Sequence, residues 1–406
     1  MRLSRRSLTT GALGLAALGT PALAQKAYGP GVTDTEVKLG QTMPYSGPVS
    51  AFSIVGRTQS AYFNMLNEQG GINGRKIRLI SLDDGFSPPK TVDRVRQLVE
   101  GDNVLALFSL LGTPTNLAVA KYLNGKKVPQ LLSAAATPLL DDPVALPWTT
   151  LLAMPQRVEA RIMIEYILKT KPDAKIGIFH QNDEYGKGYL RYFREALGDK
   201  AATMIVKETS YETTDPTVDS QILILKDSGA DTILNASTPT FAGQSLRKMA
   251  DIGWKPTHVL IYAASSIESA LKPAGLDRSV GTLTTQFFKM PDDPGWADDE
   301  AMRGYFAFMK KWQPNETALD PIALVGYIAA EVMREILAKC GDDLTRENLL
   351  KQATSFRNVA LPLLIPGVTF STTPEDHTPF RQARMYRFDG TRWVGFGDIV
   401  TAKTDK

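Results

Sequence analysis

Side chains that carry out catalysis or hold metal ions are sparse in this sequence and stand apart from one another. Cys340 is the only cysteine among 406 residues, so neither an intramolecular disulfide nor a cysteine-based metal cluster can form. The three histidines are scattered singly: His180, His258 and His377. The sequence has none of the HExxH, GxSxG and P-loop patterns that mark metalloproteases, hydrolases and nucleotide-binding proteins. We therefore expect a protein that is not an enzyme and that needs no metal and no cofactor.

One pair of neighbouring acids, Asp83-Asp84, has the residue types of a cation site. The pair directly follows a predicted strand and precedes a predicted helix that begins near Pro88. Acids at such a position more often cap the helix or orient the loop. We assign no metal to them.

The charge balance argues against nucleic acid as a partner. Lys and Arg number 46, and Asp and Glu number 43. The first 24 residues contain three arginines and no acid, so their removal leaves 43 residues of each sign. Hydrophobic residues make up 43% and charged residues 22% of the chain, which is an ordinary globular composition. A chain without excess positive charge or a basic run lacks the usual means of binding phosphates.

Residues 1–24 are predicted to be an export signal. A cationic start leads into an apolar stretch over residues 11–19, and Ala22-Leu23-Ala24 then forms a cleavage pattern before Gln25. The apolar stretch is far shorter than the ~20 residues that span a bilayer. Arg5-Arg6 adds a twin-arginine element, although a general secretory signal with two chance arginines is the alternative. We expect a periplasmic protein that begins near Gln25.

Short apolar runs alternate with amphipathic stretches through residues 37–261. The apolar runs predict strands at residues 37–41, 76–82, 104–108, 129–133, 175–179, 203–208, 232–234 and 258–261. Helical spacing predicts helices at residues 54–68, from 88, at 115–123, 157–169 and 188–197, from 217, and at 242–252. This alternation indicates an α/β protein with two doubly wound lobes, joined by a hinge near residues 148–155. Ligands in such folds bind beyond the carboxyl ends of the strands, which places a site in the cleft between the lobes.

The last third of the chain adds helices and a terminal hairpin. Helices are predicted at residues 298–312, 321–339 and 345–355, and two strands at 380–400 turn at Asp389-Gly390. We therefore predict that residues 25–153 and 283–364 form the first lobe. Residues 154–282 and 365–406 then form the second lobe.

The order of several short motifs resembles that of the periplasmic branched-chain amino acid binding proteins of ABC importers, which have the type I two-lobed receptor fold. The resemblance covers essentially the whole chain after the signal. It is carried by Tyr45-Ser46-Gly47-Pro48, Gly70-Gly71-Ile72-Asn73-Gly74-Arg75, Asp83-Asp84 with Pro89, Ser133-Ala134-Ala135-Ala136-Thr137-Pro138 and Asp183-Glu184-Tyr185-Gly186. No single motif is specific, but their order and spacing together are.

The resemblance implies a set of ligand-binding residues. In the first lobe these are Tyr45, Phe52, Thr113, Ala134, Ala136 and Thr137, and in the second lobe Tyr185, Thr238, Ala263 and Ala264. Phe52 takes the place of an aromatic that covers the ligand, and Thr113 that of a hydroxyl that meets the ligand carboxylate. Backbone groups around Ala134 and either Ala136 or Thr137 would contact the same carboxylate.

Each assignment has a plainer alternative. Phe52 could belong to the core, Thr113 could serve as a helix cap, and Tyr185 could be an ordinary surface tyrosine. Tyr327 lies on an apolar helix, for which we predict core packing.

The sequence departs from this family where amino acid binders hold the ligand ammonium. The family usually has an acid on the loop that here includes Ala263 and Ala264, whereas Glu268 comes several residues later. A buried ammonium without a counter-charge costs several kcal/mol. We therefore expect a small carboxylate with an apolar or aromatic body. A true branched-chain or aromatic amino acid binder is the alternative.

Three functions remain open from the sequence. The first is the solute-capturing subunit of an ABC importer, a monomer with a membrane permease and an ATPase as partners. The second is a ligand sensor for a membrane receptor. The third, an exported enzyme on the same scaffold, is disfavoured by the missing catalytic motifs.

Overall fold

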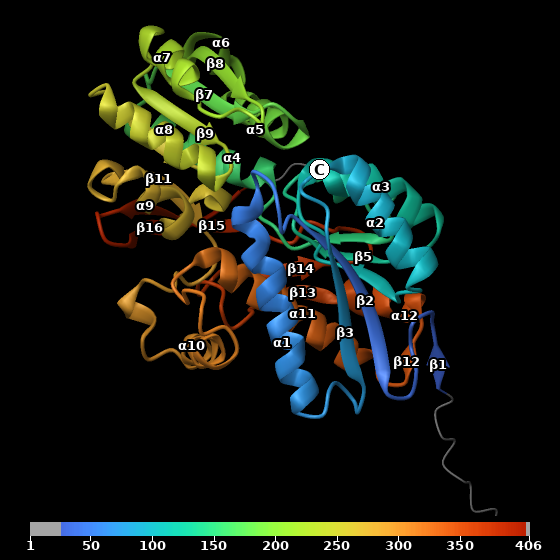
Figure 1. The fold of residues 1–406 in the computed structure, drawn as a ribbon. Coiled ribbons are helices and arrows are strands. Elements are labelled where there is room, and N and C mark those ends of the chain that lie inside the picture. The colour runs from blue at the N-terminus through green and yellow to red at the C-terminus, as the bar shows by residue number, and fades with distance from the viewer. Residues whose placement is uncertain (1–25, 403–406) are drawn as a thin grey trace, which may run out of the picture.

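The computed structural model describes residues 26–402. It divides into two lobes, each built on a largely parallel sheet, with the second lobe above the first in Figure 1. The predicted signal at residues 1–24 lies outside the described residues. In the described part of the chain, no helix has both the length and the apolar character needed to cross a membrane.

The first lobe contains a five-stranded parallel sheet in the order β3-β2-β4-β5-β6. Its strands are β2 (Glu36–Met43), β3 (Lys76–Asp83), β4 (Ala106–Phe108), β5 (Gln130–Ser133) and β6 (Thr149–Leu151). Its helices are α1 (Ser53–Glu68), α2 (Pro88–Arg96), α3 (Thr113–Gly125), α10 (Glu300–Trp312), α11 (Pro321–Cys340) and α12 (Arg346–Ala353). Helix α11 packs along α1, so a late segment of the chain completes this lobe (Figure 1).

Alternation along β4 explains why helices cover both faces of this sheet. Phe108 faces α1, where its ring lies 5.7 Å from that of Phe63. Leu107 points to the opposite face and packs with Val95 and Val119 of α2 and α3. Successive side chains of a strand point to opposite faces, so a strand that is apolar throughout needs cover on both sides.

The second lobe contains a seven-stranded sheet in the order β16-β15-β11-β10-β9-β7-β8. Its strands are β7 (Ile176–Gln181), β8 (Ile205–Tyr211), β9 (Thr232–Ala236), β10 (Thr257–Leu260), β11 (Leu283–Gln286), β15 (Gln382–Phe388) and β16 (Trp393–Thr401). Its helices are α4 (Gln156–Thr170), α5 (Glu184–Leu197), α6 (Ala201–Met204), α7 (Asp219–Asp227), α8 (Pro239–Asp251) and α9 (Lys272–Ala274). The terminal strands form an antiparallel hairpin, as the sequence predicted, and β15 pairs with β11.

Two short ladders lie outside the main sheets. β1 (Ala27–Tyr28) pairs with β12 (Asp343–Leu344), and β13 (Phe356–Val359) pairs with β14 (Phe370–Thr372). The first ladder ties the start of the described chain to the end of α11.

The α/β class with two doubly wound lobes is confirmed, but several details differ from the prediction. β6 and β11 were not predicted, because runs of three and four residues carry little periodicity. β11 pairs with β10 and β15, so the second lobe extends beyond residue 282, where we expected it to end. The other lobe boundaries remain predictions.

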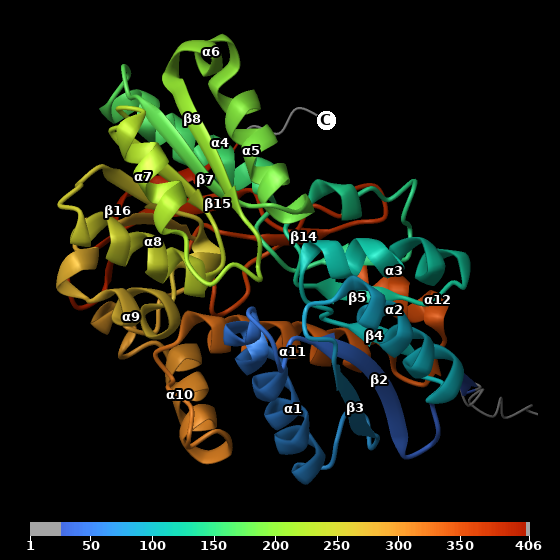
Figure 2. The same ribbon diagram turned by 45° about the horizontal axis from the view of Figure 1, so that its top comes forward.

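The two sheets share one topology that determines where a ligand can lie. In each, the first strand of the lobe has the second on one side and the third on the other. The chain leaves such neighbouring strands in opposite directions, which opens a crevice at their carboxyl ends. In Figures 1 and 2 these ends of the two lobes face each other across the middle of the molecule.

Within residues 26–402 the chain crosses between the lobes three times. The crossings follow β6, follow β11 and precede β15. A multiple connection of this kind permits rotation about a hinge while it restrains sliding.

Candidate functional site

A pocket of about 800 Å³, including its open mouth, lies between the lobes at the carboxyl ends of the two sheets. Segments after β2, β3, β4, β5 and β6 line it from the first lobe, and segments after β7, β9, β10 and β11 line it from the second. The amino-terminal turn of α11 closes a further side with Pro321, Ile322 and Val325.

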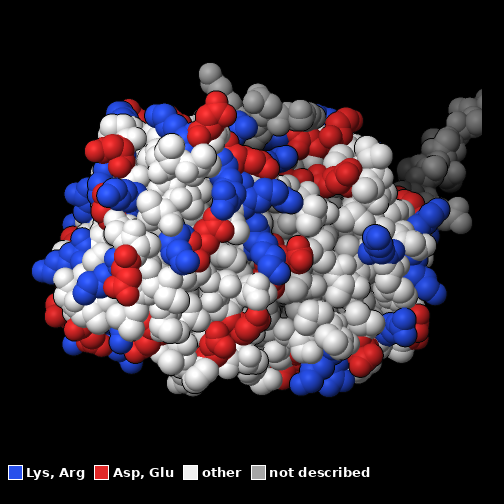
Figure 3. Space-filling view, turned by 90° about the horizontal axis from the view of Figure 1, so that it is seen from above, with Lys and Arg blue, Asp and Glu red and all other residues white. Residues whose placement is uncertain are grey.

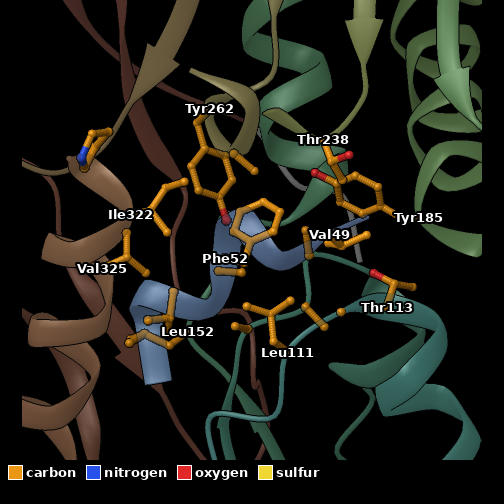
Figure 4. A pocket seen from close by; sticks show the side chains of 18 of the residues that line it. Val49, Phe52, Leu111, Thr113, Leu152, Tyr185, Thr238, Tyr262, Ile322 and Val325 are labelled. Atoms are coloured by element: carbon orange, nitrogen blue, oxygen red, sulfur yellow. The ribbon is translucent and has the colours of Figure 1, made fainter. Parts of the chain in front are cut away.

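Phe52 and Thr113 project from the first lobe into this pocket (Figure 4). Phe52 ends the short helical turn η1 (Ser50–Phe52) and leads directly into α1. Thr113 is the first residue of α3 and is 1% exposed, and its Oγ1 has no hydrogen-bond partner within residues 26–402. An unpartnered hydroxyl at a helix amino terminus is suited to a negatively charged or polar ligand group.

The backbone beside Thr113 is held in an unusual conformation. Gly112 has a φ of 99°, and a Cβ at this residue would lie 2.4 Å from the ring of Phe86. Its N–H donates to the Ala134 carbonyl at 3.1 Å, and the Ala134 N–H donates to the Leu110 carbonyl at 2.9 Å. These bonds join the two loops whose residues Thr113, Ala134 and Ala136 line the pocket.

Tyr185, Thr238 and Ala263 contribute the second-lobe wall. Asp183 caps α5 and accepts hydrogen bonds from the N–H of Tyr185 at 2.9 Å, which fixes where the tyrosine leaves the helix. The Thr238 N–H donates to the hydroxyl of the buried Tyr211 at 3.0 Å at the start of α8. Ala263 belongs to the turn η5 (Tyr262–Ala264) after β10.

Three of the four hydroxyls that line the pocket lie at one end, and the fourth, that of Tyr262, points inward near Phe52 (Figure 4). In Figure 4 the hydroxyl-bearing Thr113, Thr238 and Tyr185 gather on one side. Leu152, Ile322 and Val325 lie on the other side. Within the described part of the chain, every residue that lines the pocket is uncharged.

Two acids that lie close in sequence to lining residues, Glu268 and Asp320, are already engaged by other groups. Glu268 lies in η6 (Ile267–Leu271) and pairs with Lys272 at 3.1 Å outside the lining. Asp320 caps α11, where its carboxylate accepts from the Ile322 N–H at 3.0 Å and the Ser266 hydroxyl at 3.2 Å. Burial raises the pKa of Asp320 to about 6.

Seven of the ten predicted site residues line the pocket and three do not. The seven are Phe52, Thr113, Ala134, Ala136, Tyr185, Thr238 and Ala263. Tyr45 bonds through its hydroxyl to Ser81 Oγ at 2.6 Å, and Thr137 caps the turn η3 (Pro138–Leu140) by accepting from the Leu139 N–H. Ala264 is the last residue of η5 and is wholly buried. These three lie outside the pocket lining, because motif position does not give side-chain direction, and a role for them in ligand binding stays a prediction.

Sequence reasoning missed most of the apolar lining. The missed residues are Val49, Val55, Phe86, Leu111, Gly112, Ala135, Leu152, Ala153, Tyr262, Phe288, Pro321, Ile322 and Val325. Asp320-Pro321 marks a helix start, which could have indicated that α11 begins at a cleft. Tyr327, one turn further, packs against Tyr62, Tyr305 and Phe308, as predicted.

The face of the molecule shown in Figure 3 does not carry a charged patch of one sign. In the face shown in Figure 3, positive and negative side chains are interspersed. Asp83 and Asp84 serve the loop after β3: Asp83 accepts from Ser46 and Gly85, and Asp84 accepts from Phe86 and Thr91. This agrees with the loop-orienting role expected of that pair.

Residues 36–392 match the family of periplasmic binding proteins. The chain belongs to this family. The family comprises substrate-binding proteins and not enzymes. The chain is 26% identical to the Leu/Ile/Val-binding protein homolog 3 of Brucella melitensis, with 89% of this chain and 93% of that protein covered.

Several solved structures share the fold over nearly the whole length of both chains. A branched chain amino acid ABC transporter protein from Thermus thermophilus with bound valine has a TM-score of 0.83 at 18% identity, covering 91% of this chain and 98% of that one. A fatty acid ABC transporter substrate-binding protein from Thermomonospora curvata has a TM-score of 0.77 at 22% identity, covering 93% and 95%. At these identities the likeness concerns the type I two-lobed fold, as the sequence predicted.

Proposed function

We propose that this binding protein captures a small carboxylate with an apolar or aromatic body and delivers it to the permease of an ABC importer. The observation that carries the proposal is the pocket between the lobes, with uncharged lining throughout and the hydroxyls of Thr113, Thr238 and Tyr185 gathered at one end. The protein would work as a monomer in the periplasm after removal of residues 1–24, and an ATPase subunit would supply the energy.

The hydroxyl end suits the carboxylate. Thr113 Oγ1 has no partner within residues 26–402, and α3, which begins at Thr113, has no side chain capping its first turn. Helix amino termini favour negative charge by about 0.3–1 kcal/mol at exposed sites and by more where they are buried. A carboxylate could accept from both groups without a cationic side chain.

The apolar end suits a hydrocarbon or aromatic body. Phe52 and Tyr262 offer ring faces, and Leu152, Ile322 and Val325 offer aliphatic surface. Each Å² of apolar surface removed from water contributes roughly 25 cal/mol. An α-ammonium here would meet no acid on the pocket wall, which disfavours amino acids.

The names of two solved structures indicate that proteins with this fold bind ligands of different chemistry. The Thermus protein contains valine, and the Thermomonospora protein is named for fatty acids. Neither name specifies the ligand of this chain. The local chemistry of the pocket is the better guide.

Thermal unfolding with candidate ligands tests the proposal. The protein from Gln25 onward is unfolded, dialysed and refolded to remove any bound ligand. It is then screened with leucine, phenylalanine, benzoate, phenylacetate, hexanoate and the corresponding amides. A ligand at one hundred times its dissociation constant adds about 2.7 kcal/mol to the free energy of unfolding, which shifts the melting temperature visibly.

We expect stabilisation by acids without an α-amino group. Stabilisation by leucine or phenylalanine alone would contradict the proposed ligand class and would make Asp320 the first candidate partner of the ammonium. Stabilisation by the amides equal to that by the acids would contradict the role given to the α3 terminus.

A further inference from the structure

A buried carboxylate lies directly behind the second-lobe wall of the pocket. Glu159 is in the first turn of α4 and is 0% exposed. It does not line the pocket. A buried carboxylate is costly unless several hydrogen bonds compensate it, so its partners indicate what it holds in place.

Three donors from three different elements converge on Glu159. The Tyr262 N–H in η5 donates to Oε1 at 2.7 Å, and the Thr285 hydroxyl in β11 donates to the same oxygen at 2.6 Å. The Tyr189 hydroxyl in α5 donates to Oε2 at 2.5 Å. All three partners are neutral, and each comes from a segment far from Glu159 in the sequence.

Two of these partners connect Glu159 to aromatic side chains that line the pocket: Tyr262 lines it itself, and Tyr189 packs against Tyr185. Tyr262 lines the pocket itself, so the bond to its N–H sets where that ring begins. Tyr189 packs edge-to-face against Tyr185 at 5.4 Å and 86°, and Tyr185 lines the pocket from the other side of the same lobe. One carboxylate therefore lies behind both tyrosines that the second lobe presents to a ligand.

The third partner relates Glu159 to the hinge. Glu159 follows the first crossing, after β6, by one helical turn, and Thr285 stands one residue before the end of β11, where the second crossing begins. Their bond ties the second-lobe ends of two crossings together.

The titratable groups facing Glu159 are Tyr189 and Tyr185 from α5 and Tyr262 from η5. Burial raises the pKa of Glu159 to about 7. The three hydrogen bonds lower the pKa, but by less than burial raises it.

We propose that Glu159 is a positioning residue for ligand binding: its carboxylate fixes the backbone at Tyr262 and, through Tyr189, the ring of Tyr185. The affinity part of this inference depends on the proposed binding function. A site whose wall is held before the ligand arrives loses less conformational entropy on binding, which is the physical benefit of such a residue.

Hydrogen exchange of the ligand-free protein tests the positioning without any ligand. In Glu159→Ala the Tyr262 amide should exchange at least tenfold faster than in the wild type, since its acceptor is gone. Glu159→Gln should restore exchange to within about threefold, because the Gln carbonyl oxygen still accepts and its amide can donate to the Tyr189 oxygen. The control is Glu331→Ala, which removes a half-buried acid whose pKa is also raised, next to Tyr327 and outside the lining, and should leave the Tyr262 amide unchanged.

Binding of benzoate and hexanoate tests the contact from Glu159 through Tyr189 to Tyr185. Tyr189→Phe keeps the ring and removes only the hydroxyl, so the protein should fold normally and bind the acid that stabilises the wild type at least threefold more weakly. Tyr305→Phe is its control, because Tyr305 is a buried tyrosine whose hydroxyl has no partner within residues 26–402. Its affinity should equal that of the wild type.

The outcomes separate this inference from the proposed function. Unchanged exchange of the Tyr262 amide in Glu159→Ala, or failure of Glu159→Gln to restore it, would overturn the positioning role. If Glu159→Ala does not fold, equal affinity in Tyr189→Phe and Tyr305→Phe would overturn it instead. If neither acid binds the wild type while exchange behaves as expected, the proposed ligand class fails and the positioning of Tyr262 by Glu159 remains supported.

Discussion

Thr113 and Tyr185 belong to different lobes, yet they line the same end of one pocket. Thr113 begins the helix after β4, and Tyr185 lies in the first turn of the helix after β7. A ligand that touches both residues connects the lobes, so its binding energy is available to hold them closed. This geometry allows individual contributions to be tested by substitution.

The Thr113 hydroxyl is expected to bind the ligand carboxylate. Thr113→Val removes the hydroxyl at nearly constant volume and should weaken binding of a carboxylate ligand about tenfold, since a hydrogen bond to a charged group contributes about 1.5–3 kcal/mol. Thr113→Ser should bind like the wild type. Isothermal titration calorimetry with the best acid from the screen measures both. Normal binding by Thr113→Val together with weaker binding by Thr113→Ser would mean that the methyl group and not the hydroxyl matters.

The loop at Gly112 is expected to tolerate no side chain. Gly112→Ala should lower the free energy of unfolding by about 1–3 kcal/mol, because φ is 99° and the new Cβ would meet the Phe86 ring at 2.4 Å and Thr115 Oγ1 at 2.8 Å. Gly125→Ala, at the other end of α3, is the matched control, because a Cβ there would meet nothing within 4 Å. Urea unfolding compares them. Similar stability of the two variants would contradict the strained loop.

The apolar end is expected to set the size of the ligand. Val325→Trp places a large ring in the half-buried space beside Ile322 and should abolish the ligand-induced shift in melting temperature. Arg334→Trp, on an exposed position of the same helix, should leave the shift intact. A normal ligand shift in Val325→Trp would show that the ligand body lies elsewhere in the pocket.

Glu159 is expected to make stability depend on pH in a definite direction. Folding raises its pKa from 4.5 to about 7, so the folded protein holds this proton more tightly than the unfolded chain. Its contribution is complete below pH 4.5 and is lost as the pH rises to about 7, a decline on the order of 3 kcal/mol.

Glu159→Gln cannot lose this proton, so its curve should lack that decline. The difference in unfolding free energy between variant and wild type should therefore grow in favour of the variant from pH 4.5 to 7 and stay constant above. Other buried acids with a raised pKa, such as Asp141 and Asp320, are common to both proteins and cancel in the comparison. Urea unfolding at half-unit pH steps provides the measurement, and parallel curves would contradict the assignment.

Prediction from sequence worked where a signal is local. Residues 76–82 alternate regularly and form β3, and the long apolar period of residues 321–339 forms α11. Phe52 and Tyr185 stand in loops directly after strands, and such loops lie at the carboxyl edge whatever the rest of the chain does. Tyr45 also follows a strand at that edge, but its hydroxyl bonds to Ser81 and its side chain lies outside the pocket lining.

The sequence by itself determined the two-lobed α/β class, the absence of an acid from the loop at Ala263, and the loops that border the cleft. Those features depend on periodicity and on short motifs, which act within a few residues of the chain. Only the tertiary structure decided that Pro321, Ile322 and Val325 close the pocket and that Glu159 lies behind Tyr262. The partners of these contacts are separated by long stretches of sequence. Their meeting depends on the relative placement of whole helices and sheets, which no local pattern specifies.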